Sequence, residues 1–211
     1  MLISVIVPSY HEREWEDDSL FRCLQSVKTA IFYCPCGVEV CIAEDIKGIG
    51  KARNTGALKT TGDILVFMDA DCTMSKNFLK EVYEKSLDPK NLGGGVKYSR
   101  FDKFSLGRLC FALYVGLLLY IRRITLGAFW IRRETFMAIH GFRERLEHLD
   151  GHVIYYDEML DFDFALRLKQ YAESQGCRFR SIKKSYIIWS TRSFTKYGDW
   201  FWLKQYKLYR D

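Results

Sequence analysis

The first part of the chain alternates between short apolar runs and amphipathic segments. Three short runs predict strands at Leu2–Val7, Val38–Ala43 and Asp63–Met68, and the composition of the first and the third is typical of buried strands. Apolar residues at helical spacing predict a helix that begins near Asp18 and ends before Pro35, and a second helix over residues 50–60. Strand, helix, strand, helix, strand is the βαβαβ pattern of a parallel sheet. The sequence therefore predicts an α/β fold with a Rossmann-like, open and mostly parallel sheet flanked by helices.

The same patterns continue beyond residue 71. They predict, in order, a helix over 75–86, a turn at Asp88-Pro89, a strand at 95–98, a helix over 104–122, a strand at 125–131, a short helix from Arg133, a helix over 157–173 and two short strands within 178–189. No internal repeat and no long linker divides the 211 residues. A chain of this length is expected to form a single domain, 1–211.

An uncharged run of 13 residues, Leu109–Ile121, lies within the predicted helix over 104–122. As a helix the run measures about 20 Å, against a hydrocarbon core of roughly 30 Å, so it is too short to span a membrane. The favoured interpretation is a buried or partly buried helix. The second interpretation is an element that lies in a membrane interface.

Charge and cysteine usage point to the environment of the protein. The net charge is +6, and residues 178–211 carry nine Lys or Arg against two acids. A C-terminal segment of this kind is expected to meet an anionic partner: nucleic acid, a diphosphate or a lipid headgroup surface. The seven cysteines have an odd count and irregular spacing, which does not indicate a disulfide framework. Since Pro8 interrupts the first apolar run, we expect no signal peptide and a cytoplasmic location, at a membrane face or in solution.

Aromatic and basic residues alternate in the last segment of the chain. Trp202, Tyr206 and Tyr209 share one helical face, and three cations lie towards the other side: Lys204, Lys207 and Arg210. Such a tail is typical of a helix at a membrane interface. A surface helix packed on the domain is the alternative interpretation, and the sequence does not separate the two.

Polar clusters follow three of the predicted strands. They are Tyr10-His11-Glu12, Glu44-Asp45 and Asp69-Ala70-Asp71. In open parallel sheets, ligands bind at the carboxyl ends of the strands. Mg²⁺ and Mn²⁺ favour oxygen ligands and take one or two carboxylates together with substrate phosphates. Asp69 and Asp71 therefore predict a metal–diphosphate site, although Asp-x-Asp alone is equally common in turns and helix caps.

Five segments together carry a resemblance to a known family. They are Ser4–Tyr10, Gly50–Gly56, Thr61–Asp71, Gly127–Phe142 and Asp161–Arg167, in the family's order. In this combination the chain resembles a family 2 glycosyltransferase of the GT-A fold over about residues 2–182. The resemblance implies an inverting enzyme that moves a sugar from a nucleotide-sugar donor to an acceptor hydroxyl. It implies a nucleotide-sugar-binding half at 1–98, an acceptor-binding half at 99–190 and the tail at 191–211.

For the donor, the resemblance implies a set of binding residues in the first half. Pro8, Tyr10 and Glu12 would border the nucleoside, Asp45 or Glu44 would bond the base, Arg53 and Asn54 would line the same pocket, and Lys51 would reach the phosphates. Asp69 would contact ribose or metal, and Asp71 would be the main ligand of Mn²⁺ or Mg²⁺.

For the acceptor, the resemblance implies that Asp161 is the catalytic base and that Gly127 lies in the supporting stretch. A carboxylate can take the proton that the attacking hydroxyl loses. Asp157 and Glu158 lie just upstream and remain alternative bases. Asp163 and Arg167 are spaced i,i+4, so that an ordinary helix-surface ion pair and a role in the site are both open. The acceptor is expected to be a glycan or a glycolipid.

Two other functions compete with this reading. A nucleotidylyltransferase would use a related sheet and metal, but it usually has a Gly-rich loop where Pro8–Glu12 stands here. A nucleic-acid-binding domain would explain the basic C-terminus but not the carboxylates at the strand ends, which repel phosphates unless a metal intervenes. No nucleic-acid partner is therefore expected. The sugar, the base and the acceptor are not specified by the sequence.

Overall fold

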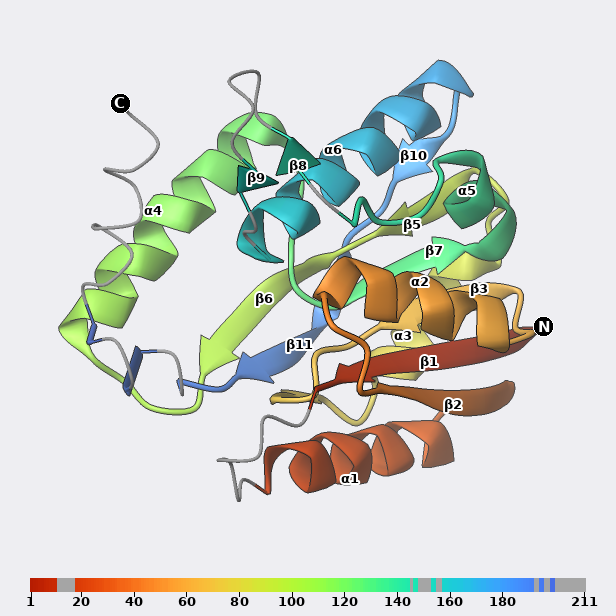
Figure 1. The fold of residues 1–211 in the computed structure, drawn as a ribbon. Helices are drawn as coiled ribbons and strands as arrows, with labels where there is room; N and C mark the ends of the chain where they lie inside the picture. The colour runs from red at the N-terminus through yellow and green to blue at the C-terminus, as the bar shows by residue number, and fades with distance from the viewer. Residues whose placement is uncertain are drawn as a thin grey trace.

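A six-stranded sheet forms the centre of the molecule, in the order β10-β5-β7-β3-β1-β2 (Figure 1). The computed structural model describes residues 1–10, 18–144, 146–147, 153–154, 157–191, 194–195 and 198–199, with the backbone alone at 146–147, 153–154 and 157–159. The strands of the sheet are β1 (Leu2–Ser9), β2 (Gly37–Glu44), β3 (Ile64–Phe67), β5 (Asn91–Gly94), β7 (Phe129–Arg132) and β10 (Arg178–Phe179). β1 pairs in parallel with β2 and β3, whereas β7 runs antiparallel to β3 and β5.

Helices cover both faces of this sheet. They are α1 (Ser19–Phe32) and α3 (Phe78–Ser86) on one face, and α2 (Ile49–Lys59), α5 (Arg133–Ala138) and α6 (Asp157–Ser174) on the other. The division follows from the two-residue period of a strand, because Val5 and Val7 of β1 join the first core while Ile6 joins the second. Burial on both faces explains why the central strands are almost wholly apolar.

A second, three-stranded sheet has the order β4-β11-β6, from β4 (Cys72–Met74), β11 (Ile182–Trp189) and β6 (Val96–Phe101). Its register shifts between Ile182 and Tyr186. Glu81 of α3, 4% exposed, accepts the backbone N–H groups of the three residues in this shift, Lys183, Lys184 and Ser185, at 2.7–3.1 Å. The carboxylate thus satisfies donors that the bulged ladder leaves unpaired. A short antiparallel pair, β8 (Leu146–Glu147) and β9 (Val153–Ile154), completes the described strands.

α4 (Leu106–Arg122) stands at one side of the molecule, apart from the six-stranded sheet (Figure 1). The Ser105 hydroxyl accepts the N–H of Arg108 at the helix start, and Arg123 ends the helix in the left-handed conformation. The interpretation of Leu109–Ile121 as a buried or partly buried helix holds in its second form, since only Gly107 and Arg108 of α4 are fully buried and the run itself is partly buried. The physical reason is that α4 packs on the body along one side only. Among the described residues no helix is long and apolar enough to cross a membrane.

The predicted α/β fold with its mostly parallel sheet is confirmed. Three details differ: β4, β8 and β9 were not predicted, the strand expected at 95–98 is the pair β5 and β6, and the strand expected at 125–131 begins at Phe129. The division of the chain into 1–98, 99–190 and 191–211 stays a prediction. The aromatic-basic helix expected after Asp199 lies outside the described residues.

Candidate active site

One buried arginine connects the two halves of the site. Arg53 of α2 is 2% exposed, and its Nη2 donates to Oδ1 of Asp69 at 2.7 Å. Its Nη1 donates to Oδ1 of Asp161 on α6, and its guanidinium lies 4.8 Å from the centre of the Phe142 ring. Three segments that are far apart in sequence therefore converge on one planar cation. The carboxylates of Asp69 and Asp161 are held within the span of a single guanidinium.

The charge of Arg53 is favoured by its partners. Burial opposes a charged guanidinium, but Asp161 and then Asp69 outweigh this and raise the pKa of Arg53 above its ordinary value. The side chains of Asp69 and Asp161 are 33% and 15% exposed, so that solvent screens these contacts only in part. The trio of Arg53, Asp69 and Asp161 carries a net charge of about −1 at neutral pH.

The segment Asp69-Ala70-Asp71 leaves the sheet through a tight turn. The N–H of Met68 still bonds the carbonyl of Ile6 at 3.0 Å, and the N–H of Cys72 already returns to the carbonyl of Asp69 at 3.0 Å. Asp69 and Asp71 are both half-buried. Burial, followed by the charges of Asp69 and Asp71, raises the pKa of the Cys23 thiol to about 12. This end of β3 is therefore a region of negative potential.

A divalent cation fits this strand end by its donor chemistry. Asp69 and Asp71 supply hard carboxylate oxygens, which suit Mg²⁺ and Mn²⁺. Within the described ranges no group of three or more His, Cys, Asp or Glu side chains is placed to hold a metal. Two carboxylates completed by substrate phosphates are the usual arrangement for these cations, so the pair is a sufficient protein contribution.

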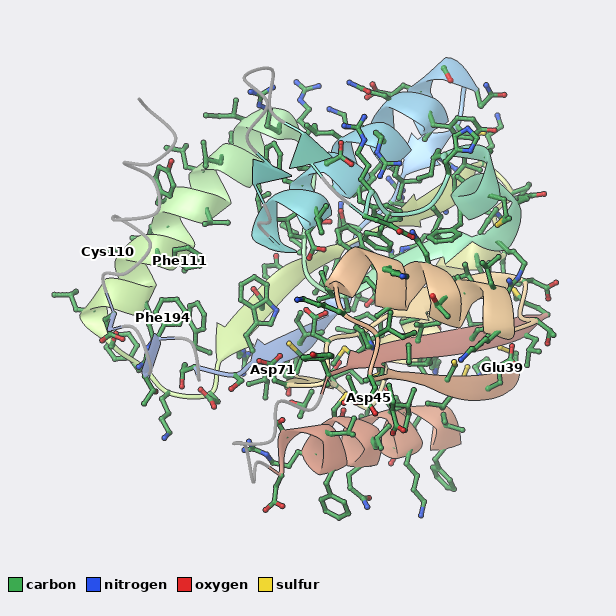
Figure 2. The ribbon with its side chains drawn as sticks, in the orientation of Figure 1. Glu39, Asp45, Asp71, Cys110, Phe111 and Phe194 are labelled. Carbon is green, nitrogen blue, oxygen red and sulfur yellow. The ribbon has the colours of Figure 1, made fainter. Side chains whose placement is uncertain are left out.

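The other predicted donor residues lie at the same edge of the sheet. The β1–β2 register places Ser9 beside Glu44, and the N–H of Asp45 bonds the Ser9 carbonyl at 3.1 Å. Figure 2 shows Asp45 and Asp71 at this end and Glu39 at the opposite end. Of the other predicted donor residues, Pro8 is half-buried, and Tyr10, Glu44 and Lys51 are exposed. Glu12 lies outside the described residues.

Asn54 has its amide engaged within the protein. Its Nδ2 donates to the carbonyl of Phe142 at 2.8 Å, and its Oδ1 accepts the Phe142 N–H at 2.9 Å. The preceding Gly141 has φ +60°, and a Cβ there would stand 2.6 Å from Asn54 Oδ1. Asn54 therefore fixes the loop that brings the Phe142 ring to Arg53. Roles for Arg53 and Asn54 in a nucleotide pocket stay predictions.

Asp163 and Arg167 form the i,i+4 ion pair that their spacing predicts, with Arg167 Nε 2.8 Å from Asp163 Oδ2. Arg143 approaches the other oxygen of Asp163 at 3.4 Å. Gly127 adopts φ +84° in the turn before β7, where a Cβ would stand 2.7 Å from a side-chain carbon of Ile187. Sequence reasoning assigned no site role to Arg143 or to the ring of Phe142, although Phe142 ends the Gly127–Phe142 segment that carries the family resemblance.

A mostly parallel sheet covered on both faces, with acidic groups gathered at the carboxyl ends of its first strands, is the architecture of the glycosyltransferase class with the GT-A fold. The sequence profile of the family described as "Glycosyl transferase family 2" matches residues 33–149. The match spans more than half of the chain, and the chain belongs to this family. Membership of this family favours sugar transfer over the nucleotidylyltransferase and nucleic-acid-binding readings. A search of curated protein sequences finds no significant match.

Solved structures support the fold. S. aureus TarS has a TM-score of 0.60 at 16% identity, over 93% of this chain and 38% of that protein. The catalytic domain of Drosophila β1,4-galactosyltransferase 7, in complex with xylobiose, has a TM-score of 0.56 at 13% identity, over 86% and 64%. The mannosyltransferase PcManGT from Pyrobaculum calidifontis, in complex with GDP-Man and Mn²⁺, has 0.56 at 16%, over 88% and 56%. The chain thus spans between 38% and 64% of the length of these structures.

Proposed function

We propose that the protein transfers a sugar from a nucleoside-diphosphate sugar to an acceptor hydroxyl in a single displacement that inverts the anomeric carbon. Asp161 is the base, Asp69 and Asp71 hold a divalent cation, and Arg53 positions Asp161 against the donor end of the site. The observation that carries the proposal is the pair of contacts from Arg53 to Asp69 and Asp161. A base and a cation-binding carboxylate that share one guanidinium are close enough to act on one donor molecule.

Asp161 meets the requirements of a base in this setting. An adjacent guanidinium favours the ionised carboxylate, which is the form that accepts a proton. The Asp161 side chain is 15% exposed, so that it is held in the site and still open to a hydroxyl. A positioned carboxylate typically contributes 10²–10⁴-fold to such a proton transfer. Asp157 and Glu158 remain the alternatives, since their side chains lie outside those that the structure describes.

On the donor side, the residues at the carboxyl ends of β1 and β2 are proposed to bind the nucleotide. Asp45 or Glu44 bonds the base, while Pro8 and Tyr10 border the nucleoside. Lys51, exposed on the first turn of α2, is proposed to approach phosphate. When bound, a divalent cation stabilises the charge that develops on the departing diphosphate. A Drosophila relative was solved with manganese, UDP-Gal and xylobiose, and PcManGT with GDP-Man and Mn²⁺, which supports both the cation and the donor class.

Two substitutions test the chemistry. Asp71→Ala is expected to abolish metal-dependent turnover of the donor without unfolding the protein, because Asp71 is a half-buried group at the end of a strand. Asp161→Asn is nearly isosteric and cannot accept the proton, so it is expected to lower kcat by about 10²-fold or more while donor affinity is retained. Glu173→Gln, an exposed acid on the same helix as Asp161, is the matched control.

The measurements are donor hydrolysis and sugar transfer with and without manganese, after a thermal-shift screen of nucleoside diphosphates has identified the base. Near-wild-type turnover of Asp71→Ala at ordinary metal concentrations would refute the metal assignment. If Glu158→Gln abolishes transfer and Asp161→Asn does not, the base lies one helical turn upstream.

A further inference from the structure

The outward side of α4 is an uninterrupted apolar surface. Six exposed side chains lie within one arc of the helix: Leu106, Leu109, Leu113, Leu117, Tyr120 and Ile121. We call this surface the α4 outer face. Leu113, Leu117 and Tyr120 are 66%, 59% and 81% exposed. At about 1.5 Å per residue the face extends for roughly 22 Å. Contiguous apolar surface of this extent on a folded protein marks an interaction site.

The inward side of α4 explains why the described part of the chain leaves the outer face uncovered. Phe111 packs against Phe101 and Phe194 at centroid distances of 6.4 and 5.5 Å (Figure 2). The only charged side chain of the first three turns, Arg108, is buried, and its Nε donates to Asp199 at 3.0 Å. At the other end, Lys169 donates to the carbonyl of Arg122 at 2.8 Å. The helix is thus held firmly along one side, and the apolar side is presented outward.

A basic cleft adjoins the C-terminal half of the α4 outer face. It has a volume of about 550 Å³, and Tyr120 and Ile121 belong both to its lining and to the outer face. Three cations line it, Lys97 from β6, Arg123 from the end of α4 and Lys183 from β11, all of them exposed. No acidic residue is among its described lining residues. The cleft therefore combines apolar walls with positive charge.

The Glu81 contact accounts for the place of Lys183. Because Glu81 draws the backbone N–H groups of residues 183–185 towards α3, the side chains of Lys183 and Lys184 point to solvent. The position of Lys183 at the cleft is therefore set by the buried carboxylate of Glu81 on α3. It is a fixed feature of the surface.

We propose that the α4 outer face docks on an anionic lipid–water interface, with its leucines among the acyl chains and Lys97, Arg123 and Lys183 on headgroup phosphates. An exposed apolar helix face flanked by cations has the chemistry of an interfacial membrane anchor. Each basic residue near an anionic surface strengthens the attraction about fivefold. Three such residues amount to about a hundredfold.

The charges around α4 favour a lipid surface over a second copy of the chain as the partner of the α4 outer face. α4 contains no acidic residue, and exposed cations stand at both of its ends: Lys103 before it, and Arg122 and Arg123 after it. Two outer faces packed antiparallel would bring Lys103 of one copy towards the arginines of the other, and parallel packing would bring the arginines together. Like charges in such positions repel. A surface of anionic phosphates removes this conflict.

The test is flotation of the full chain with phosphatidylcholine vesicles that contain or lack phosphatidylglycerol, at low and high sodium chloride. Wild type is expected to bind the anionic vesicles and to lose most of this binding at high salt. Leu113→Glu with Leu117→Glu is expected to weaken binding at least about tenfold. Leu58→Glu is the matched control, because Leu58 is a 70% exposed helical leucine on α2, and its binding should equal wild type.

A second set tests the cations. Lys97→Gln, Arg123→Gln and Lys183→Gln together are expected to weaken binding about a hundredfold. The control removes three exposed lysines elsewhere, at positions 28, 59 and 80, and should change binding far less. Circular dichroism and thermal melts establish that every variant is folded.

Three outcomes would overturn the proposal: wild type that stays unbound with anionic vesicles, glutamate variants that bind as wild type does, or cation variants that match their control. Sedimentation measurements test whether the α4 outer face binds a second copy of the chain instead of a lipid surface. A wild-type dimer that dissociates in the Leu113→Glu, Leu117→Glu variant, without vesicle binding, would assign the α4 outer face to self-association. Vesicle binding requires neither donor nor acceptor, so its failure leaves the proposed sugar transfer untouched.

Discussion

Replacing Arg53 tests whether one cation holds the site together. Arg53→Met keeps the approximate length of the side chain and removes the charge between Asp69 and Asp161. Removing one partner of a buried ion pair costs about 3–5 kcal/mol, because the remaining charge is left without compensation. Asp69 is 33% exposed and Asp161 15%, so solvent screens part of this penalty. We expect a loss of about 3 kcal/mol in the free energy of unfolding.

For a chain of this size, each kcal/mol shifts Tm by roughly 2–4 °C, so the expected fall is about 6–12 °C. Arg178→Met is the matched control. Arg178 also pairs with an aspartate, Asp88, but the two side chains are 44% and 45% exposed. Exposed pairs are worth about 1 kcal/mol or less, and the control should melt within a few degrees of wild type. Equal melting temperatures for the two variants would contradict a stabilising role for the buried ion pairs of Arg53 with Asp69 and Asp161.

A double-mutant cycle isolates the contact between Arg53 and Asp161. The cycle compares Arg53→Met, Asp161→Asn and the double variant by urea unfolding at neutral pH. Since Asp161→Asn removes one of the charges that Arg53→Met leaves unpaired, the double variant should lose less than the sum, by about 1–3 kcal/mol. Additivity within roughly 0.5 kcal/mol would show that the two side chains act independently.

Arg53→Lys separates positioning from donor binding. An ammonium is a compact point charge, and it cannot bond two carboxylates in one plane as a guanidinium does. Because misplacing a catalytic group by about 1 Å can cost 10²-fold, we expect kcat to fall by about 10- to 100-fold while KM for the donor changes little. A raised KM with unchanged kcat would instead place Arg53 in the nucleotide pocket, as the family resemblance implies.

Three further changes test the fold and the electrostatics. Glu81→Gln should cost about 2–3 kcal/mol at neutral pH, measured by urea unfolding, because an amide cannot accept from three N–H groups in the same way. Burial opposes the Glu81 charge, but the N–H groups of residues 183–185 and Lys85 lower the pKa of Glu81 below its ordinary value. The stabilisation by the Glu81 carboxylate is therefore present above about pH 4.5 and is lost as the pH falls through the folded pKa. The difference between wild type and variant should therefore vanish in acid, and a constant difference would contradict the assignment. Gly141→Ala should destabilise by about 1–3 kcal/mol in thermal melts, since φ is +60° and the new Cβ meets Asn54; an unchanged Tm would refute this. Thermal shifts by nucleoside diphosphates should be larger with manganese than with a chelator, and equal shifts would count against a metal-assisted donor site.

The central layer of the fold was predictable because its strands β1 and β3 are runs of apolar residues buried on both faces. Such a run is recognisable without knowing its neighbours. β4 was missed for the opposite reason: Cys72–Met74 is a strand through pairing with β11, more than a hundred residues away along the chain. Three residues carry no periodicity of their own. The strand is defined by its partner.

The strand-end carboxylates were predictable from position, whereas their pairing was not. Arg53 and Asp161 are 108 residues apart, and the sequence around each gives no sign of the other. The ordinary helix-surface pair of Asp163 and Arg167 was, by contrast, a matter of i,i+4 spacing on one helix. Local geometry can be derived from spacing, and a contact between elements requires the packing of the whole core.

α4 shows a different limit of the same reasoning. Its composition correctly indicates an apolar helix, but hydrophobicity does not say which surface the helix meets. In the fold, Phe111 and Arg108 attach it along one side through Phe194 and Asp199, so that the leucines at 113 and 117 face outward. The six-stranded sheet already has helices on both faces, and among the described residues of α4 only Leu119 packs against its cores. The α4 outer face therefore adds nothing to the cores, which is the reason to assign it to a contact outside the chain.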